Sequence, residues 1–219
     1  MFSSVHQSEV VKHLIIINAI MMVATFLAQS VFRLPLTAYL GLYYIDFDAF
    51  QPWQIVTHMF MHGGLAHIFF NMYALFIFGV ILERVWGAQR FLFYYLFTGL
   101  MAAVFQLGAT AVEYQLMYGT IFPISQGISE PAIPMVGASG AVMGVVAAFG
   151  VLFPNTQLQL LFPPVRLTAK WLVVIVIGID VLMLFMGNTG IAHWAHIGGA
   201  LSGFLLIKLV WGRDRNTFY

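Results

Sequence analysis

Long apolar stretches, separated by short polar or turn-forming segments, dominate the chain. A helix needs about 20 mostly apolar residues to cross the hydrocarbon core of a bilayer. Six stretches meet this requirement: 12–32, 65–83, 90–112, 136–153, 169–187 and 192–211. The pattern therefore predicts an all-α, polytopic membrane protein, in which residues 1–219 form a single domain with a six-transmembrane-helix bundle.

Two connecting segments are too mixed in composition to span a membrane. Residues 33–64 combine aromatic side chains with Asp46, Asp48 and Pro52, and we expect a long interfacial loop with short amphipathic pieces between the first two spans. Residues 114–135 are rich in Pro, Gly and Ser and are predicted to form a second loop.

Composition narrows the class of protein. Hydrophobic residues make up 61% of the chain and charged residues only 8%, whereas soluble domains carry about 25% charged residues. The net charge of +1 argues against nucleic-acid binding. The chain has no cysteine, which excludes disulfides, thiolate metal sites and a cysteine nucleophile.

The apolar run after Lys12 has one alternative interpretation, a cleaved signal peptide. The run is about as long as a full span, which signal peptides usually are not, and this favours an uncleaved first helix.

The basic residues predict the orientation. In a six-span arrangement one side of the membrane receives Lys12, Arg84, Arg90, Arg166, Lys170, Lys208, Arg213 and Arg215. The other side receives Arg33 together with Asp46, Asp48, Glu113 and Glu130. Because cytoplasmic loops are enriched in Lys and Arg, both termini are predicted to be cytoplasmic.

Polar groups within a span are costly and often functional, and four candidates stand out: His67, Asn71, Ser139 and His196. Each could instead be a hydrogen-bonding contact between helices. The fourth span favours chemistry, because its 18 residues (136–153) reach only about 27 Å. Ser139, near its start, is then expected below the outer surface, with residues 114–135 lining a cavity above it.

Glycines predict how the fourth and sixth spans meet. Gly140 and Gly144 form one small-xxx-small pair, and Gly199 and Gly203 form another on the face of His196. Such faces allow close approach, so we expect Ser139 to reach His196.

That contact would support nucleophilic catalysis. A neutral imidazole can take the proton of a serine hydroxyl. The unpaired amides at the helix start, with Asn71 and His67, could then stabilise an oxyanion. Asp180 is the only acid deep within a span. We expect a packing or gating role for it in preference to a place in a catalytic triad.

The motifs that carry these residues resemble those of the rhomboid family of intramembrane serine proteases. GASG at 137–140 is similar to the nucleophile motif, AHIGGALSG at 195–203 to the histidine motif, and HIFFN at 67–71 to the HxxxN motif. HMFMHGG at 58–64 and ERVWG at 83–87 resemble two further family segments. The resemblance covers about residues 53–203 and is specific because the motifs occur in order.

The resemblance implies roles for individual residues. Ser139 would be the nucleophile and His196 the base, while His67 and Asn71 would stabilise the oxyanion. Gly137, Gly140, Met143, Gly199 and Gly203 would support the site, without metal or cofactor. Two positions depart from the common pattern: Gln54 stands where many members have Arg, and Met143 where many have an aromatic ring against the histidine.

The implied function is cleavage of single-span membrane proteins within the bilayer, in a bacterial cytoplasmic membrane. Three alternatives remain. One is an inactive relative that binds membrane proteins. The second is a metal enzyme or metal transporter using His58, His62 and His67, although no HExxH motif accompanies them. The third is a channel or carrier. The sequence does not indicate an oligomeric state.

Overall fold

Each of the six apolar stretches contains a helix. The protein is represented by a computed structural model that describes residues 8–159, 164–186 and 191–211. The helices are α1 (Glu9–Phe32), α2 (Leu36–Leu40), α3 (Gln54–Thr57), α4 (Leu65–Ala74), α5 (Val80–Trp86), α6 (Ala88–Tyr118), α7 (Ser139–Leu152), α8 (Ala169–Leu184) and α9 (His193–Leu205). Short 3₁₀ turns occupy η1 (His58–Phe60) and η3 (Ile124–Gln126), and π-helical turns occupy η2 (Leu75–Gly79) and η4 (Leu206–Val210).

Four helical stretches are long and apolar enough to cross a membrane. They are Glu9–Phe32, Leu65–Trp86, Ala88–Tyr118 and His193–Val210. The second joins α4 and α5 through η2, and the fourth joins α9 to η4. The apolar α7 has 14 residues and α8 has 16, so both are shorter than these four. The protein is an integral membrane protein with a mostly helical fold.

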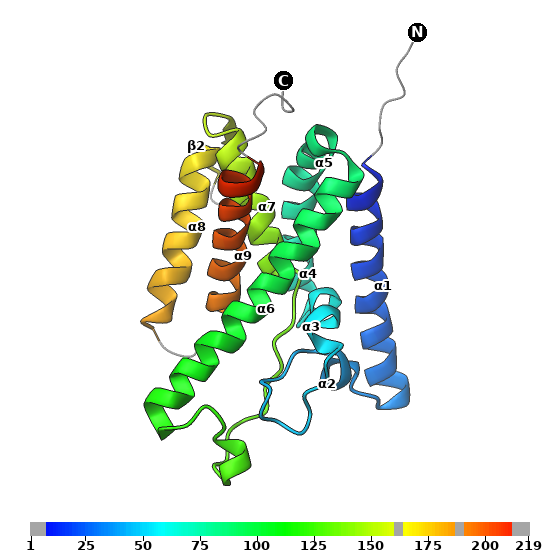
Figure 1. Ribbon diagram of the computed structural model, residues 1–219. Helices are drawn as coiled ribbons and strands as arrows, with labels where there is room; N and C mark the ends of the chain where they lie inside the picture. The colour runs from blue at the N-terminus through cyan, green and yellow to red at the C-terminus, as the bar shows by residue number, and fades with distance from the viewer. Residues whose placement is uncertain (1–7, 160–163, 187–190, 212–219) are drawn as a thin grey trace.

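Helix α7 forms the centre of the bundle. It packs against α6, α8 and α9 and against η2, while α1 and α8 lie at opposite sides of the molecule (Figure 1). Residues Gly140–Gly150 are all buried. A helix that is apolar on every face is usually buried. The sequence of α7 is apolar on every face, and the neighbouring helices surround it.

Some boundaries differ from the predicted spans. The third span was predicted at 90–112 but extends through Tyr118 as the 31-residue α6. The fourth span begins at Ser139 and not at residue 136. Gly137 has φ +133° and its amide donates to the carbonyl of His58, so the backbone is not helical there. Residue 187, the predicted end of the fifth span, lies outside the described residues.

A small hairpin interrupts the otherwise helical fold. Strands β1 (Gln157–Gln159) and β2 (Arg166–Thr168) pair antiparallel, with Gln157 opposite Thr168. The all-α prediction therefore missed one two-stranded element, in the connection between α7 and α8. Three residues per strand carry too short an alternating pattern to be recognised from sequence.

The two predicted loops are joined at one end of the bundle, opposite the start of α1 (Figure 1). Leu42 and Met135 form an isolated antiparallel bridge. Asp46 accepts a hydrogen bond of 2.6 Å from the amide of Ile124 and others from the amide and hydroxyl of Ser125. These contacts fix the segment that leads into α7, and therefore help to fix Ser139.

Candidate active site

Ser139 is the first residue of α7. The helix has 14 residues, which corresponds to a length of about 21 Å, well under the roughly 30 Å of a hydrocarbon core. No side chain caps its N-terminus. The first amides of a helix have no partner within the helix, so those around Ser139 are available to a ligand.

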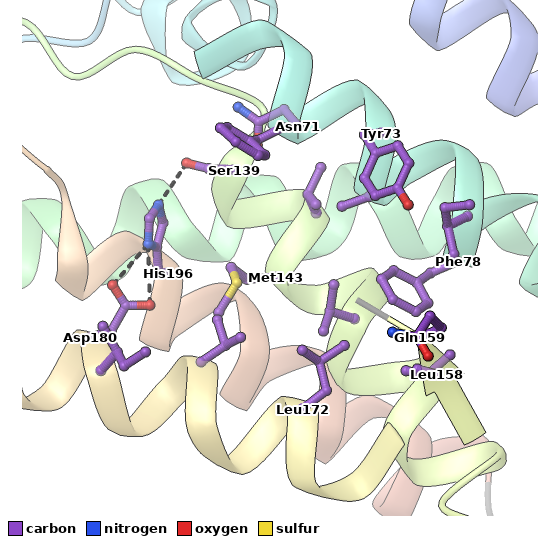
Figure 2. Close-up of a pocket in the computed structure, with 17 residues that line it drawn as sticks. Asn71, Tyr73, Phe78, Ser139, Met143, Leu158, Gln159, Leu172, Asp180 and His196 are labelled. Carbon is purple, nitrogen blue, oxygen red and sulfur yellow. Dashed lines mark hydrogen bonds and ion pairs between the residues drawn. The ribbon is translucent and has the colours of Figure 1, made fainter. Parts of the chain in front are cut away.

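The hydroxyl of Ser139 is hydrogen-bonded to an imidazole. The distance from Ser139 Oγ to His196 Nε2 is 2.8 Å, and the two residues come from α7 and α9 (Figure 2). This is the contact that the sequence predicts. Hydrogen-bond contact between nucleophile and base is the geometric requirement for activating a serine.

Asp180 on α8 lies on the other side of the same imidazole. His196 Nδ1 is 3.0 Å from Asp180 Oδ1 and 3.2 Å from Oδ2 (Figure 2). His193 Nδ1 is 2.6 Å from the same Oδ1. From the sequence, packing or gating is the preferred role for Asp180 and a place in a triad the less favoured one, and the structure pairs the acid with both histidines. Buried acids in membranes nearly always pair, which was the available signal, but sequence alone did not identify the partner.

The serine and histidine meet because the backbones of α7 and α9 touch. A Cβ added at Gly199 would lie 2.0 Å from the carbonyl oxygen of Gly140. Only a residue without a side chain fits there, as the small-xxx-small pattern predicts.

The other half of each glycine pair has a different partner. A Cβ at Gly144 would meet Thr98 at 2.6 Å, and one at Gly203 would meet the hydroxyl of Tyr94 at 2.1 Å. Both neighbours belong to α6, whose Tyr94 hydroxyl donates to the carbonyl of Gly144 at 2.8 Å. The predicted direct packing of α7 on α9 is therefore found where the Gly140 carbonyl meets Gly199, whereas Gly144 and Gly203 pack against α6. A Cβ at Gly140 would also meet α6, at Ala102.

Asn71 and His67 flank the serine from α4. Asn71 is 6% exposed and its amide Nδ2 has no hydrogen-bond partner among the described residues. It lines the same two cavities as Ser139 and His196, and Figure 2 shows it next to Ser139. An unpaired buried amide is costly, so it is a donor available to a reacting group.

His67 adjoins the backbone just before Ser139. A Cβ at Gly137 would lie 2.9 Å from His67 Nε2, and this, with its φ of +133°, explains the glycine. The amide of Gly63 donates to His67 Nδ1 at 3.4 Å. The neutral ring then carries its proton on Nε2, the nitrogen that faces Gly137.

Two cavities meet at Ser139. One, of about 510 Å³, lies between α4 with η2 and α8, and its lining residues include Phe70, Tyr73, Val176 and Ile179. The other, of about 740 Å³, is lined by the loop residues Gly63, Gly64 and Met135 and by Ala192. Asn71 and His196 contribute to both. The hydroxyl of Ser139 is thus accessible both from between the helices and from the loop end.

A model of the Rhomboid domain matches residues 49–213 of the chain. The chain belongs to the rhomboid family.

Relatives with similar sequences occur in plants and bacteria. RHOMBOID-like protein 12, mitochondrial, of Arabidopsis thaliana is 34% identical over 78% of this chain and 50% of its own length. Putative rhomboid protease YdcA of Bacillus subtilis (strain 168) is 31% identical over 70% and 65%, respectively. Rhomboid protease AarA of Providencia stuartii is 30% identical over 70% and 54%. The chain therefore spans about half to two thirds of the length of these relatives.

The first departure from the common rhomboid pattern has a structural explanation. Gln54, which stands where many members have Arg, is fully buried. Its Oε1 accepts hydrogen bonds from the amides of Tyr43 and Gln51, and its Nε2 donates to the carbonyls of Ala49 and Tyr39. One neutral side chain thus satisfies four backbone groups of the segment between α1 and α4.

The ERVWG segment contacts the N-terminus of α1 through Glu83. The carboxylate of Glu83 accepts hydrogen bonds of 2.9 Å from the amides of Val10 and Val11. These are unpaired amides of the first turn of α1, where a negative charge is favoured. Glu83 therefore attaches α1 to α5.

Met143 lies one helical turn after Ser139. It is 9% exposed, packs with Ala147 and Ala200, and lines the cavity between the helices. Figure 2 shows its side chain beside that of His196, on the α7 side. This is the position predicted from the four-residue spacing.

One group of described residues has a geometry that could hold a metal ion. The ligand atoms of Asp180, His193 and His196 lie within 4.8 Å of one another. The alternative trio proposed from sequence, His58, His62 and His67, is not such a group among residues 8–159. His58 Nδ1 donates to the carbonyl of Gln54 at 2.9 Å, and His62 and His67 pack edge to face.

Proposed function

We propose that this protein is an intramembrane serine endopeptidase that uses Ser139 as nucleophile and His196 as general base. The observation that carries the proposal is the 2.8 Å contact between Ser139 Oγ and His196 Nε2 at the start of a short buried helix. Membership of a family that includes rhomboid proteases supports it. The rhomboid-like mitochondrial relatives do not all carry the word protease in their names.

The proposed reaction has two halves. His196 takes the proton of Ser139 as Oγ bonds to the scissile carbonyl carbon, and returns it to the leaving amine as the peptide bond breaks. Water then gives a proton to His196 as its oxygen bonds to the acyl carbon, and His196 returns that proton to Ser139 Oγ as the ester bond breaks, which releases the acid and free Ser139. The oxyanion of each tetrahedral intermediate would receive hydrogen bonds from Asn71 Nδ2, from His67 and from the first amides of α7.

We propose transmembrane segments of single-span proteins as substrates. The cavity between α4 with η2 and α8 has mainly apolar lining residues and opens beside Ser139, so it suits an apolar segment arriving from the bilayer. Helical peptide bonds are screened by their own hydrogen bonds. Segments weakened by Gly or Pro are therefore the expected substrates, because they unwind at lower cost.

We also propose six membrane crossings with both termini in the cytoplasm. The four long helices would cross fully, and α7 and α8 would complete the bundle at shorter length. A bacterial cytoplasmic membrane fits the basic-residue pattern. A reporter at Tyr219 should then be cytoplasmic, and an epitope inserted after Ser129 should be labelled from outside. Labelling of residue 129 from the cytoplasm would refute this orientation.

The decisive experiment compares purified protein with the variants Ser139→Ala, His196→Ala and the double variant, using a model single-span substrate in proteoliposomes. Each single variant should lose detectable cleavage. The double variant should lose little more, because members of a catalytic unit are not additive. EDTA should leave the wild-type rate unchanged.

Other outcomes would identify the alternatives. Substrate binding without cleavage by the wild type would indicate an inactive rhomboid relative. Loss of activity in EDTA, restored by zinc, would indicate a metal enzyme. Clear residual cleavage by Ser139→Ala would refute the nucleophile assignment.

A further inference from the structure

Helix α8 brings one acidic side chain to the reacting pair. The side chain of Asp180 is 8% exposed, and two histidines of α9 hydrogen-bond to it. Oδ1 is 2.6 Å from His193 Nδ1, and the two oxygens are 3.0 and 3.2 Å from His196 Nδ1. His196 Nε2 faces Ser139 at 2.8 Å. Three side chains from three helices therefore form one line, which Figure 2 shows.

We infer that Asp180 is a positioning residue for His196, so that the site works as a Ser-His-Asp triad in which His193 holds the acid. The inference rests on the proposed protease function. It assigns to this chain an acidic member that the serine and histidine motifs do not specify.

The first consequence concerns the tautomer of His196. A neutral imidazole has one nitrogen that donates and one that accepts. Because an ionised carboxylate only accepts, the nitrogen facing Asp180, Nδ1, carries the proton. Nε2 then presents its lone pair to the hydroxyl of Ser139. This is the tautomer that a general base requires.

The second consequence concerns charge. When Ser139 Oγ bonds to the substrate carbonyl, its proton moves to His196 Nε2 and the ring becomes a cation. The carboxylate of Asp180, on the opposite edge of the ring, is already placed to stabilise that cation and takes no proton itself. The proton later leaves from Nε2 to the departing amine. A fixed charge acts strongly here because the surroundings are poorly polarisable.

The third consequence concerns His193. An ionised acid buried among helices is costly unless hydrogen bonds satisfy it. His193 supplies a second donor to Oδ1, and it lies one turn before His196 on the same helix. Two donors from α9 therefore fix the carboxylate of α8. Met143, which lies on the α7 side of the ring, is flexible and imposes no plane on it.

The test uses the isosteric variant Asp180→Asn together with Asp180→Glu, with Asp48→Asn as the control. Asp48 is exposed in the interfacial loop, and its variant makes the same change in charge away from the site. Asp180→Asn should lower kcat by about 10²–10⁴-fold at nearly unchanged KM. Asp180→Glu should recover part of the rate, and Asp48→Asn should match wild type.

A spectroscopic measurement separates positioning from packing. Nitrogen NMR of ¹⁵N-histidine-labelled protein, assigned with His196→Gln, should show the Nδ1–H tautomer of His196 in wild type. In Asp180→Asn the amide can donate to Nδ1, so the Nε2–H tautomer should appear. His193→Gln should keep the wild-type tautomer and lose rate about tenfold, within the lower range of supporting contacts.

The outcomes separate this inference from the protease proposal. If Ser139→Ala retains cleavage, the assignment of Ser139 as nucleophile fails, while the tautomer measurement still tests Asp180. If Asp180→Asn keeps the wild-type kcat and tautomer, the triad is refuted while the serine and histidine roles stand. Activity that depends on added zinc, and disappears in both Asp180→Asn and His193→Gln, would instead assign the cluster to a metal and also refute the triad.

Discussion

The carbonyl oxygen of Gly140 lies where a side chain at Gly199 would have to be, 2.0 Å from the position of its Cβ. This backbone contact between α7 and α9 sets the separation of Ser139 and His196. Ser139 stands one position before Gly140, and His196 stands three before Gly199. Any increase in the separation of the two helices therefore lengthens the hydrogen bond between Ser139 and His196.

Gly199→Ala should therefore reduce both stability and activity. The methyl group meets a backbone carbonyl, which cannot rotate away, so we expect a loss near the upper end of the roughly 1–3 kcal/mol typical of overpacking. Melting temperature and kcat on purified protein measure the two effects. Gly178→Ala on α8 is the matched control, because its added Cβ has no neighbour within 4 Å. Equal behaviour of the two variants would contradict the assigned contact.

Asn71→Ala should lower kcat by about 10²–10³-fold, the usual value of one oxyanion donor, and leave KM nearly unchanged. The reason is that its buried Nδ2 has no partner among the described residues and lies beside Ser139. Steady-state kinetics on a model substrate measure this. Asn18→Ala is the control, since Asn18 is buried in α1 and donates to Leu14. A rise in KM at constant kcat would mean that Asn71 binds the ground state.

Met143→Ala should cost about 2 kcal/mol of stability, the lower end for such truncations, because one side of Met143 already borders a cavity. Its kcat should fall only a few-fold, since Asp180 also orients His196. Met143→Leu is the control for packing, and Met143→Tyr should retain activity. Thermal melts with parallel rate assays decide this. A kcat loss as large as that of Asp180→Asn would assign the orienting role to Met143.

Mild acid should destabilise the interfacial loop through its histidines. Burial, with a smaller contribution from neighbouring His67, lowers the pKa of His62 to about 4. The unfolded state, with a pKa near 6.5, then binds more protons as the pH falls. The contribution of neutral His62 to the free energy of unfolding is therefore fully present above about pH 6.5 and is lost as the pH falls toward 4.

Melting temperatures between pH 7 and pH 5 measure this decline, and His62→Gln should make it shallower. Part of the decline should remain, because burial lowers the pKa of His58 to about 4 as well. An unchanged slope in His62→Gln would show that its ring is protonated equally in both states.

Part of this protein could be read from the sequence because the relevant information is local. Runs of about 20 apolar residues fix where helices form, since an unpaired backbone is too costly in lipid. The motifs around Ser139, His196, His67 and Asn71 identified the candidate site residues, and the three-residue offset from His196 to Gly199 placed both on one helix face. The position of Met143 one turn after Ser139, on the same helix face, also follows from spacing.

The tertiary structure decided which distant residues meet. Asp180 precedes His196 by 16 residues and lies on another helix, and the packing of α8 on α9 brings their side chains together. Gly144 and Gly203 face Thr98 and Tyr94 of α6, a third helix that the glycine spacing does not reveal. Gln54 stands where many family members have Arg, and its amide makes four hydrogen bonds to backbone groups that only the folded loop brings together. Periodicity determines the face of a helix, whereas the partner of that face depends on how all the helices pack around α7 at once.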